Sequence, residues 1–307
     1  SGVRIKNDEY AKDDVADFAL WKRWDAADGD VAWDSPWGRG RPGWHIECSA
    51  MSMKFLGEHF DLHTGGVDNM FPHHEDEIAQ SEAATGCKFV NYWLHCEHLI
   101  VNGQKMSKSL GNFYTLRDLL NKGYSGREIR YLLISAQYRQ KLNFTVDALD
   151  VARQVLRRFD DFRRRLQEAA GTGPDRGAEA ASAALTGPAA AFRAGLESDL
   201  NTPEALAALF DAMREINKLL DAGTLAGEGV APVTGFLAEV DSVLGILEPE
   251  AGTSDAVPPA IQALVDARQA ARKARDFALA DSLRQQLTAA GWRLEDTPKG
   301  PRVVPAT

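Results

Sequence analysis

Two lysines on a short segment are the strongest chemical signal in the sequence. Lys105 and Lys108 stand three residues apart, with Ser107 and Ser109 beside them. Two cations at this spacing on a loop suit a polyphosphate, because they can stabilise the negative charge that shifts when a bond to its α-phosphate breaks. An ordinary solvated lysine turn is the alternative. The chemistry predicted for this segment is therefore electrostatic.

A second group of side chains could hold a metal ion. Cys48, His73 and Glu77 offer a thiolate, an imidazole and a carboxylate, and the spacing of His73 and Glu77 puts both on one face of a helix. Three protein ligands leave one corner of a tetrahedral zinc ion open, for a substrate or for a fourth ligand from elsewhere. The alternative is a core cysteine near an ordinary surface helix.

Three polar residues follow His73 directly. Glu75 and Asp76 could in principle bind metal, but at two and three positions from His73 they point around the helix. We therefore interpret them as acids that favour the start of a helix. His74 is expected to support the metal ligands from outside.

The cysteines indicate thiols or metal ligands rather than disulfide bonds. Cys48, Cys87 and Cys96 are the three cysteines of the chain, too few and too unevenly placed for a disulfide framework. This favours the cytoplasm. Cys96 follows His95, but alternate residues of a strand face opposite ways. We therefore expect a structural role for this pair rather than a Cys/His site.

Composition predicts a globular protein of two or three domains. The chain has 307 residues, of which 44% are hydrophobic, and this is enough for a well-buried core. The sequence contains no run of 18 or more apolar residues, and its first residues lack the pattern of a signal peptide. A formal net charge of −9 disfavours non-specific binding of polyanions. Any nucleic-acid partner must therefore meet local basic patches.

The first half of the chain is predicted to be the α/β part. Residues 18–112 hold all seven histidines and six of the seven tryptophans, mixed with short apolar runs. Within them, residues 71–80 are predicted to form a helix, because Pro72 suits a first helical position, acids follow it and Gly86 is a plausible stop. Residues 6–17 are typical of a linker or loop.

From about Thr115 the sequence changes to helical periodicity. One long helix is predicted from the apolar residues Val151, Val155, Leu156, Phe159, Phe162 and Leu166. Breaks are predicted at residues 171–174 together with an alanine-rich loop after them, at 226–229 and at 249–259. The Thr202 hydroxyl and Pro203 are expected to start another helix. Residues 261–274 and 276–290 are predicted to form two more, with Gly291 as terminator before a strand-like tail.

Several segments resemble the class I aminoacyl-tRNA synthetases. Residues 105–109 are identical to the signature loop of that class. The chain also carries a series of segments in the order found in cysteinyl-tRNA synthetases: 17–22, 33–38, 40–51, 71–80, the lysine loop, 199–203, 276–281 and 294–298. The resemblance spans nearly the whole chain, and it favours the functional interpretation of both the lysine segment and the metal group.

The resemblance implies a role for each member of the metal group. Cys48, His73 and Glu77 would be three of the family's zinc ligands, and Trp44 would line the pocket for the amino acid. The family's zinc binds the thiolate of the substrate cysteine. Serine is then rejected because its hydroxyl is a harder, less acidic ligand, and valine because it offers none.

The resemblance also implies a nucleotide site. Lys108 would be the ATP-binding lysine, and Lys105 and Lys108 would together stabilise the developing charge of pyrophosphate. Gly66 and Asp68 would lie under the adenosine. The implied reaction is the activation of cysteine by ATP, with Mg²⁺, to cysteinyl adenylate, followed by transfer to the terminal adenosine of tRNA(Cys). No covalent enzyme intermediate is implied.

The implied architecture has three parts. An α/β Rossmann-type remnant, the second half of a class I catalytic domain, would occupy residues 1–114. An all-α anticodon-binding bundle would follow over residues 115–250, and a small C-terminal domain that recognises the anticodon over residues 251–307. One zinc ion per subunit and a cytoplasmic location complete the expectation.

Basic residues supply an expectation about RNA. The predicted helices carry clusters of arginine and lysine: Arg153, Arg157, Arg158, Arg163, Arg164, Arg165, Arg268, Arg272, Lys273, Arg275 and Arg284. A charge run is usually a solvated helix face. With the resemblance, however, we predict that the bundle and the terminal domain contact tRNA along its inner side and at its anticodon.

The sequence departs from the family pattern at two points. It contains no His-x-Gly-His motif and no cysteine before Cys48, which in the family bind the ATP phosphates and complete the zinc site. We therefore expect a missing N-terminal catalytic half, in cis or in trans, and an isolated chain that is incomplete for catalysis. The alternatives are a non-catalytic RNA-binding or regulatory derivative, and the paralogous cysteine ligase of mycothiol synthesis, which lacks the region 276–298.

Overall fold

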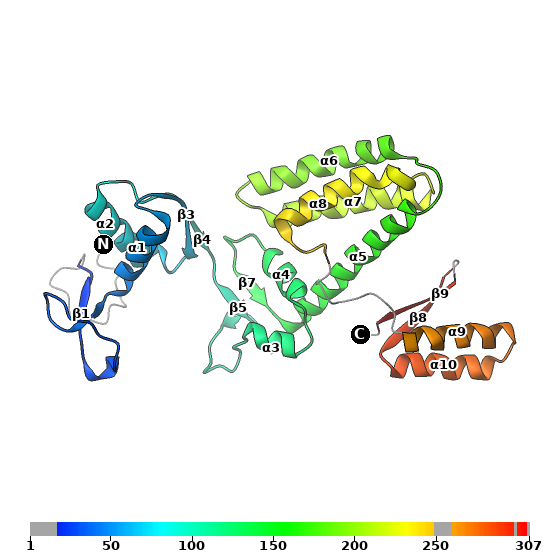
Figure 1. The fold of residues 1–307 in the computed structure, drawn as a ribbon, viewed down its shortest axis with the longest axis horizontal. Helices are drawn as coiled ribbons and strands as arrows, with labels where there is room; N and C mark the ends of the chain where they lie inside the picture. The colour runs from blue at the N-terminus through cyan, green and yellow to red at the C-terminus, as the bar shows by residue number, and fades with distance from the viewer. Residues whose placement is uncertain (1–16, 249–258, 298–299, 306–307) are drawn as a thin grey trace. The chain divides into compact units, whose positions relative to one another are not determined.

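The computed structural model describes residues 17–248, 259–297 and 300–305 (Figure 1). By its internal contacts the chain divides into two compact units, Ser1–Glu248 and Pro249–Thr307. The predicted linker over residues 6–17 and the predicted break over residues 249–259 lie almost wholly outside the described residues. In the part that is described, no helix combines the length and the apolar character needed to cross a membrane.

A β-α-β arrangement forms the centre of the first part of the chain. Strand β3 (Phe60–Gly66) pairs in parallel with β4 (Val90–Cys96), and the connection between them contains the turn η2 (Met70–His74) and helix α2 (Glu75–Thr85). Parallel pairing requires such a crossover, since a tight turn can join only antiparallel strands. The carboxyl ends of β3 and β4 therefore meet at one edge of this small sheet.

The elements before β3 complete this part. Strand β1 (Trp21–Arg23) pairs antiparallel with β2 (Gly40–Pro42), and between them lies the short turn η1 (Ala26–Asp28). Helix α1 (Trp44–Leu56) follows β2 directly and packs against α2.

The helix predicted over residues 71–80 begins later than expected. Helix α2 starts at Glu75, because Phe71 has extended backbone angles (φ −145°, ψ 133°) inside the preceding turn. Proline removes a backbone donor and disfavours helical geometry in the residue before it, which here is Phe71. The predicted stop is confirmed: Gly86 adopts the left-handed conformation (φ 72°) and its N–H donates to the carbonyl of Glu82.

A three-stranded sheet carries the lysine segment. Its order is β6 (Gln104–Lys105), β5 (Leu99–Val101) and β7 (Leu142–Phe144), with β5 antiparallel to β6 and parallel to β7. Helices α3 (Leu116–Asn121) and α4 (Gly126–Ile134) lie between β6 and β7 in the chain. A cluster of buried side chains that includes Val101, Leu119 and Phe144 joins the sheet to these helices and to the start of the next one.

Long helices form the rest of the first unit, so the predicted order of an α/β part followed by a helical bundle is confirmed. The bundle consists of α5 (Val146–Ala170), α6 (Ala178–Glu197), α7 (Thr202–Asp221), the turn η3 (Gly227–Val230) and α8 (Ala231–Leu244). One apolar core runs through it, with Phe159, Phe192 and Leu209 almost fully buried.

The alanine-rich stretch after Pro174 was predicted to be a loop, and this prediction is wrong. It forms helix α6, which packs against α7 and α8 and buries Ala181, Leu185 and Phe192. Alanine has the highest intrinsic helix propensity, and the buried residues supply the tertiary contacts that stabilise the helix. The helix also contains Pro188, so a single proline did not end it.

Two details of the predicted bundle need correction. Val151 is 57% exposed, because the buried stripe of α5 runs through Leu149, Ala152 and Leu156 instead. Helix α7 is capped by the side-chain oxygen of Asn201, which accepts from the N–H of Glu204, rather than by a Thr202 hydroxyl. The remaining predicted members of the α5 stripe, from Leu156 to Leu166, are confirmed.

The second unit has its own small core. Helices α9 (Pro259–Lys273) and α10 (Phe277–Ala289) pack together, and β8 (Trp292–Thr297) pairs antiparallel with β9 (Gly300–Pro305). Both predicted helices are confirmed within two residues at each end, and the predicted strand-like tail is the β8–β9 hairpin. The core contains Ile261, Val265, Leu287 and Leu294.

Candidate functional site: a histidine-rich centre and a lysine loop

The structure brings the predicted metal ligands together. Cys48 lies on α1, His73 in η2 and Glu77 on α2, and one ligand atom from each lies within 4.8 Å of the others. His73 and Glu77 are buried and Cys48 is half-buried. A thiolate, an imidazole and a carboxylate at such separations have the donor types of a zinc site.

Glu77 is the centre of this group. Its carboxylate is fully buried, with His73 Nε2 2.9 Å from Oε1 and His63 Nε2 2.8 Å from Oε2. Oε1 accepts no well-aligned hydrogen bond although it is buried. A buried oxygen in this state carries a desolvation cost that a bound cation would offset. The geometry therefore fits a metal ion on the side of Glu77 that faces His73 and Cys48.

Sequence reasoning predicted a supporting role for His74 but missed His45, His63 and His95. His45 Nδ1 lies 2.7 Å from His73 Nδ1, and His74 Nδ1 lies 2.7 Å from His95 Nε2. His63, His74 and Glu77 form a second set of ligand atoms within 4.8 Å of one another. The signal that could have found them is the confinement of all seven histidines to residues 45–98. Contacts between strands that are distant in sequence cannot be read from spacing alone.

The pKa values of the site follow from burial and from the shared carboxylate. Burial would raise the pKa of Glu77, but the imidazoles of His63 and His73 outweigh it and hold the pKa at about 2. The same hydrogen bond to Glu77 raises the pKa of His63. Burial lowers the pKa of His74 to about 4. Burial, with Glu77 and Glu47 nearby, raises the pKa of the Cys48 thiol. Without a cation the thiol is thus held in its neutral form.

Trp44 covers one side of the centre. Its ring stacks on His73 with 4.1 Å between ring centroids and an interplanar angle of 26°. The residue is 56% exposed, so the indole lies between the candidate ligands and solvent. Trp44 is the first residue of α1, directly after the extended Gly43, and this placement explains why it reaches the site from the end of the helix.

Gly66 and Asp68 lie at the carboxyl end of β3, where β3 and β4 end side by side. In open α/β sheets ligands bind outside the carboxyl ends of the strands. A side chain on Gly66 would come within 2.3 Å of Asp68 Oδ1, so the glycine permits this close approach. Gly65 has a similar role next to His74, whose ring would be 2.6 Å from an added Cβ. The predicted nucleotide role of Gly66 and Asp68 stays a prediction.

The other polar candidates are not among the Cys48, His73 and Glu77 ligand atoms, although Asp76 connects to His73 through His45. Glu75 is exposed, whereas Asp76 Oδ2 lies 3.3 Å from His45 Nε2. Cys87 and Cys96 are exposed, and the Cys96 thiol contacts the Gly65 carbonyl at 3.5 Å.

The lysine segment forms a loop after β6. Lys105 ends β6, and the exposed Lys108 places its amine 5.6 Å from the centre of the Phe113 ring. Met106 anchors the loop by packing against the cluster around Val101. The loop thus follows the β6–β5–β7 sheet, whereas the Cys48 group lies on α1 and in the connection between β3 and β4.

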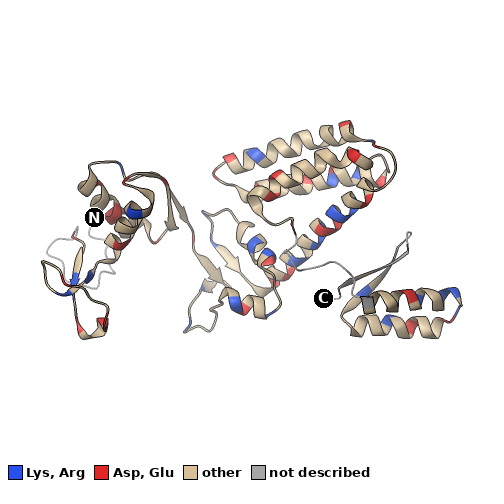
Figure 2. Cartoon of the chain, in the orientation of Figure 1, with Lys and Arg blue, Asp and Glu red and all other residues tan. Residues whose placement is uncertain are grey.

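Most arginines of α5 have acidic partners. Arg153 pairs with Glu128, Arg163 with Glu248, and Arg164 with Asp161 and Glu168. Figure 2 shows acidic and basic residues interspersed along this long helix. The positive charge of this helix is therefore more neutralised than its sequence suggests.

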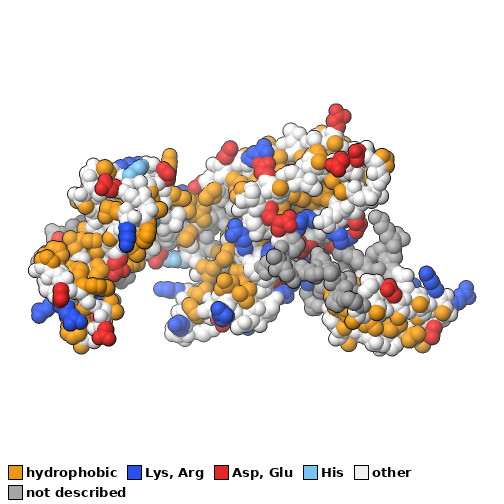
Figure 3. Space-filling view, in the orientation of Figure 1, with side chains coloured by type: hydrophobic (Ala, Val, Ile, Leu, Met, Phe, Trp, Pro, Cys, Tyr) orange, Lys and Arg blue, Asp and Glu red, His pale blue; other side chains and the backbone are white. Residues whose placement is uncertain are grey.

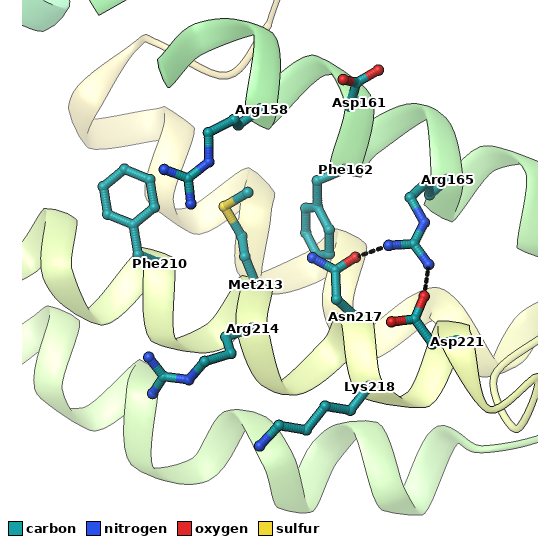
Figure 4. Close-up of a pocket in the computed structure, with 10 residues that line it drawn as sticks. All are labelled: Arg158, Asp161, Phe162, Arg165, Phe210, Met213, Arg214, Asn217, Lys218 and Asp221. Atoms are coloured by element: carbon teal, nitrogen blue, oxygen red, sulfur yellow. Dashed lines mark hydrogen bonds and ion pairs between the residues drawn. The ribbon is translucent and has the colours of Figure 1, made fainter. Parts of the chain in front are cut away.

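A groove between α5 and α7 is lined in part by the basic residues Arg158, Arg165, Arg214 and Lys218. It has a volume of about 580 Å³, with Phe162, Phe210 and Met213 among its apolar lining. Figure 4 shows Arg165 held by Asn217 and Asp221, and the Arg158 guanidinium lies 5.2 Å from the centre of the Phe210 ring. Arg214, paired with Asp211, and Lys218, paired with Glu215, complete the basic lining, and Asp161 and Asp221 also line the groove.

Three family descriptions match successive parts of the chain. Residues 2–154 match the class I (C) tRNA synthetase catalytic domain, residues 191–248 the DALR domain, and residues 254–301 the cysteinyl-tRNA ligase anticodon binding domain. The first two matches fall in the first compact unit and the third in the second, with residues 155–190 unmatched.

Curated relatives match nearly the whole chain. A cysteine–tRNA ligase of Solibacter usitatus is 51% identical over 304 residues, which is 98% of this chain and 64% of the relative. One from Chlamydia pneumoniae is 47% identical over 306 residues, 98% of this chain and 63% of the relative. The chain thus spans somewhat less than two thirds of the length of these relatives.

A solved structure supports the fold. A LeuRS of Agrobacterium radiobacter, solved in a ternary complex with tRNA and LeuAMS, has a TM-score of 0.50 at 15% identity and covers 71% of this chain and 35% of its own. Its likeness agrees with the class I architecture of an α/β part followed by helices. With the three successive family matches and the curated relatives, this leads to one conclusion: the chain belongs to the cysteinyl-tRNA synthetase family.

Proposed function

We propose that this chain is part of a cysteine–tRNA ligase, which activates cysteine with ATP and transfers it to the 3′ end of tRNA(Cys). The observation that carries the proposal is the identity of about half the residues, over 98% of the chain, with relatives of that name. The buried Cys48, His73 and Glu77 group and the lysine loop supply the two kinds of chemistry that such a reaction needs. A cytoplasmic location is part of the same proposal.

The first kind of chemistry is recognition of cysteine. Cys48, His73 and Glu77 would hold one zinc ion, and zinc bound there supplies a soft acceptor for the thiolate of the substrate. Trp44 would cover the bound side chain from the solvent side, because it stacks on His73 and stays half-exposed. Serine and valine would be rejected for want of a suitable ligand atom.

The second kind is charge stabilisation on ATP. Lys105 and Lys108 would neutralise the negative charge that moves onto pyrophosphate as the cysteine carboxylate attacks the α-phosphate. Mg²⁺ would accompany the nucleotide, and Gly66 and Asp68 would lie under the adenosine. The lysine amines need only electrostatic contact, since no proton transfer or covalent intermediate on the chain is required.

The groove between α5 and α7 is our candidate for the RNA-facing surface of the bundle. The Arg158 guanidinium lies against the Phe210 ring and forms no ion pair with a carboxylate of the described residues, and its planar group can bond a phosphate through two N–H groups. Phe210 beside it offers an apolar surface. Contacts of this kind hold the backbone of a nucleic acid without reading its sequence.

An exposed apolar surface favours a further catalytic segment. Trp37 is 77% and Phe55 76% exposed, and Figure 3 shows hydrophobic side chains gathered over the part of the chain that holds β1, β2 and α1. Contiguous apolar surface of this kind usually marks an interface. We propose that the N-terminal catalytic half of the relatives, in cis or in trans, covers it.

The proposal is tested with the complete gene product. Cysteine-dependent exchange of labelled pyrophosphate into ATP, followed by transfer of cysteine to tRNA(Cys), is the expected result. Transfer to an amino sugar instead of tRNA would point to the mycothiol-pathway paralogue. RNA binding without pyrophosphate exchange would point to a non-catalytic derivative, and either outcome would overturn the ligase.

The metal part has a separate test that needs no activity. The purified chain should carry about one zinc ion, and Cys48→Ala or His73→Ala should remove most of it. Cys87→Ala is the matched control, because Cys87 is exposed and lies outside the group. Zinc content that is unchanged in both Cys48→Ala and His73→Ala would end this assignment.

A further inference from the structure

The side chain of Asn112 joins the two ends of the lysine loop. Its Oδ1 accepts from the backbone N–H of Ser107 at 2.8 Å, and its Nδ2 donates to the carbonyl of Lys105 at 3.1 Å. These two partners flank Met106, so one amide group bonds to the chain on both sides of that residue. Asn112 is half-buried, which protects the contacts in part from water.

Only an amide can make both contacts. A carboxylate in its place would accept from Ser107 but would repel the Lys105 carbonyl, and a hydroxyl is too short to reach both. The two backbone partners also fix which end of the amide is oxygen, because an N–H can only donate and a carbonyl can only accept.

Further hydrogen bonds connect residues 107–111 of the loop to one another. Leu110 N–H donates to Ser107 Oγ at 3.2 Å, Ser107 Oγ lies 3.1 Å from Ser109 Oγ, and Gly111 N–H donates to the Lys108 carbonyl at 3.2 Å. Gly111 has φ 64°, so the chain can turn back towards Asn112. Residues 105–112 are thus closed on themselves, with Lys105 at the start of the loop and Lys108 within it.

We infer that Asn112 is a positioning residue that closes the loop 105–112 and keeps Lys105 and Lys108 at a fixed separation. The inference rests on the proposed function for its consequence, the presentation of both amines to one polyphosphate. The closed loop itself is independent of that function. Because the Lys105 and Lys108 side chains are long and exposed, the positions of their amines depend on the backbone that carries them.

The first test concerns the loop alone. In Asn112→Leu, which keeps the shape but neither contact, we expect amide hydrogen exchange at Ser107 to become about tenfold faster, because its N–H loses its acceptor. Asn112→Asp keeps that acceptor, so Ser107 should exchange near the parental rate while trypsin cleaves after Lys105 faster than in the parent. Asn91→Leu on β4, which removes an exposed amide contact to Asp61 of β3, should change neither rate.

The second test concerns the consequence, in the complete enzyme. Asn112→Leu should lower the rate of adenylate formation about tenfold or more, with Kd for cysteine and zinc content unchanged, because the loop and the metal group use different residues. Parental exchange at Ser107 in Asn112→Leu overturns the inference whatever the activity. If the complete protein shows no pyrophosphate exchange, the proposed function is overturned instead. Faster amide hydrogen exchange at Ser107 in Asn112→Leu would still support the closed loop in that case.

Discussion

At the scale of single residues, Lys108 has the sharpest expected effect. The exposed Lys108 amine lies near the Phe113 ring and forms no ion pair with a carboxylate in the described part of the chain. A charge in this state costs little to redirect towards a phosphate, since no ion pair has to be broken first.

We therefore expect Lys108→Ala to be a catalytic variant of the complete enzyme. A charge-assisted contact to the transition state contributes about 2 to 4 kcal/mol, so adenylate formation should slow by on the order of 30- to 1000-fold. Lys108→Arg should recover only part of the rate, because a planar fork places its charge differently. Single-turnover kinetics measure this rate. If adenylate formation in Lys108→Ala stays within about twofold of the parental rate and only the cysteine requirement rises, the loop does not act on ATP.

Asp199 offers a test by pH. Hydrogen bonds from Arg139 and Tyr138 lower its pKa below 3.8, so any stabilisation from this carboxylate is present above pH 3.8 and is lost as the pH falls through the lower value of the folded state. An NMR titration should find the pKa lowered in the parent and returned towards 3.8 in Arg139→Gln. Arg193→Gln removes the guanidinium that pairs with Glu239 and should leave the titration of Asp199 unchanged.

The sequence predicted that Cys48, His73 and Glu77 lie together, as the structure shows, but it did not predict their surroundings, and their metal role stays a prediction. Cys48, His73 and Glu77 could be named because two of them share a helical spacing and the third belongs to a recognisable segment. His63 and His95 lie on strands β3 and β4, and their contacts with Glu77 and His74 depend on the register of a parallel pair. Register is a property of the folded sheet, so no local pattern contains it.

At the scale of elements, two glycines of the same region have opposite expected effects. A Cβ at Gly229 would lie 1.8 Å from the carbonyl oxygen of Arg176, whereas nothing lies within 4 Å of a Cβ at Gly235 in α8. Gly229→Ala should therefore destabilise the first unit by about 1 to 3 kcal/mol through overpacking. Gly235→Ala should stabilise it by about 0.5 to 1 kcal/mol, because alanine favours the helix. Denaturant unfolding measures both, and equal effects would contradict the close approach of η3 to Arg176.

Helices were predictable where a stripe of large apolar residues marked them. Helix α5 was found from such a stripe, although Val151 was included because it lies one position from Ala152 and alanine gives a weak signal. Helix α6 was missed for the same reason, since its core face includes Ala181 and Gly195 and a proline lies within it. Small residues are buried there because α6 approaches α7 closely, which only the packed structure reveals.

At the scale of the whole molecule, each compact unit has a core of its own. Phe192 belongs to the bundle core and Leu287 to the core of the second unit. Units with separate cores need not unfold in one step, so a single melting temperature does not describe them.

Calorimetry should therefore resolve two transitions. Leu287→Ala should destabilise the second unit by roughly 2 to 5 kcal/mol and shift only its transition, and Phe192→Ala should shift only the transition of the first unit by a comparable amount. One transition that moves as a whole in both variants would show that the two cores unfold together.

The order of α/β part, bundle and small terminal part was predictable from composition, because tryptophan and histidine gather in one region and helical periodicity begins after it. The division within the first unit was less accessible. Buried residues around Val101 and Phe144 join the lysine-bearing sheet to α5, so the α/β part and the bundle meet in packing that crosses the predicted boundary at residue 114. That boundary stays a prediction.

The stacking of Trp44 on His73 has an optical consequence. An excited indole in face-to-face contact with an imidazole can lose its excitation by transferring an electron to that ring, and a cation bound to His73 changes how readily the ring accepts the electron. The emission intensity of Trp44 should therefore change when a cation binds and return to its starting value when a chelator removes the cation. Since the indole is also half-exposed, the wavelength of its emission maximum should shift when a small molecule displaces water from its outer face. The centre thus contains a native fluorophore that reports its own occupancy.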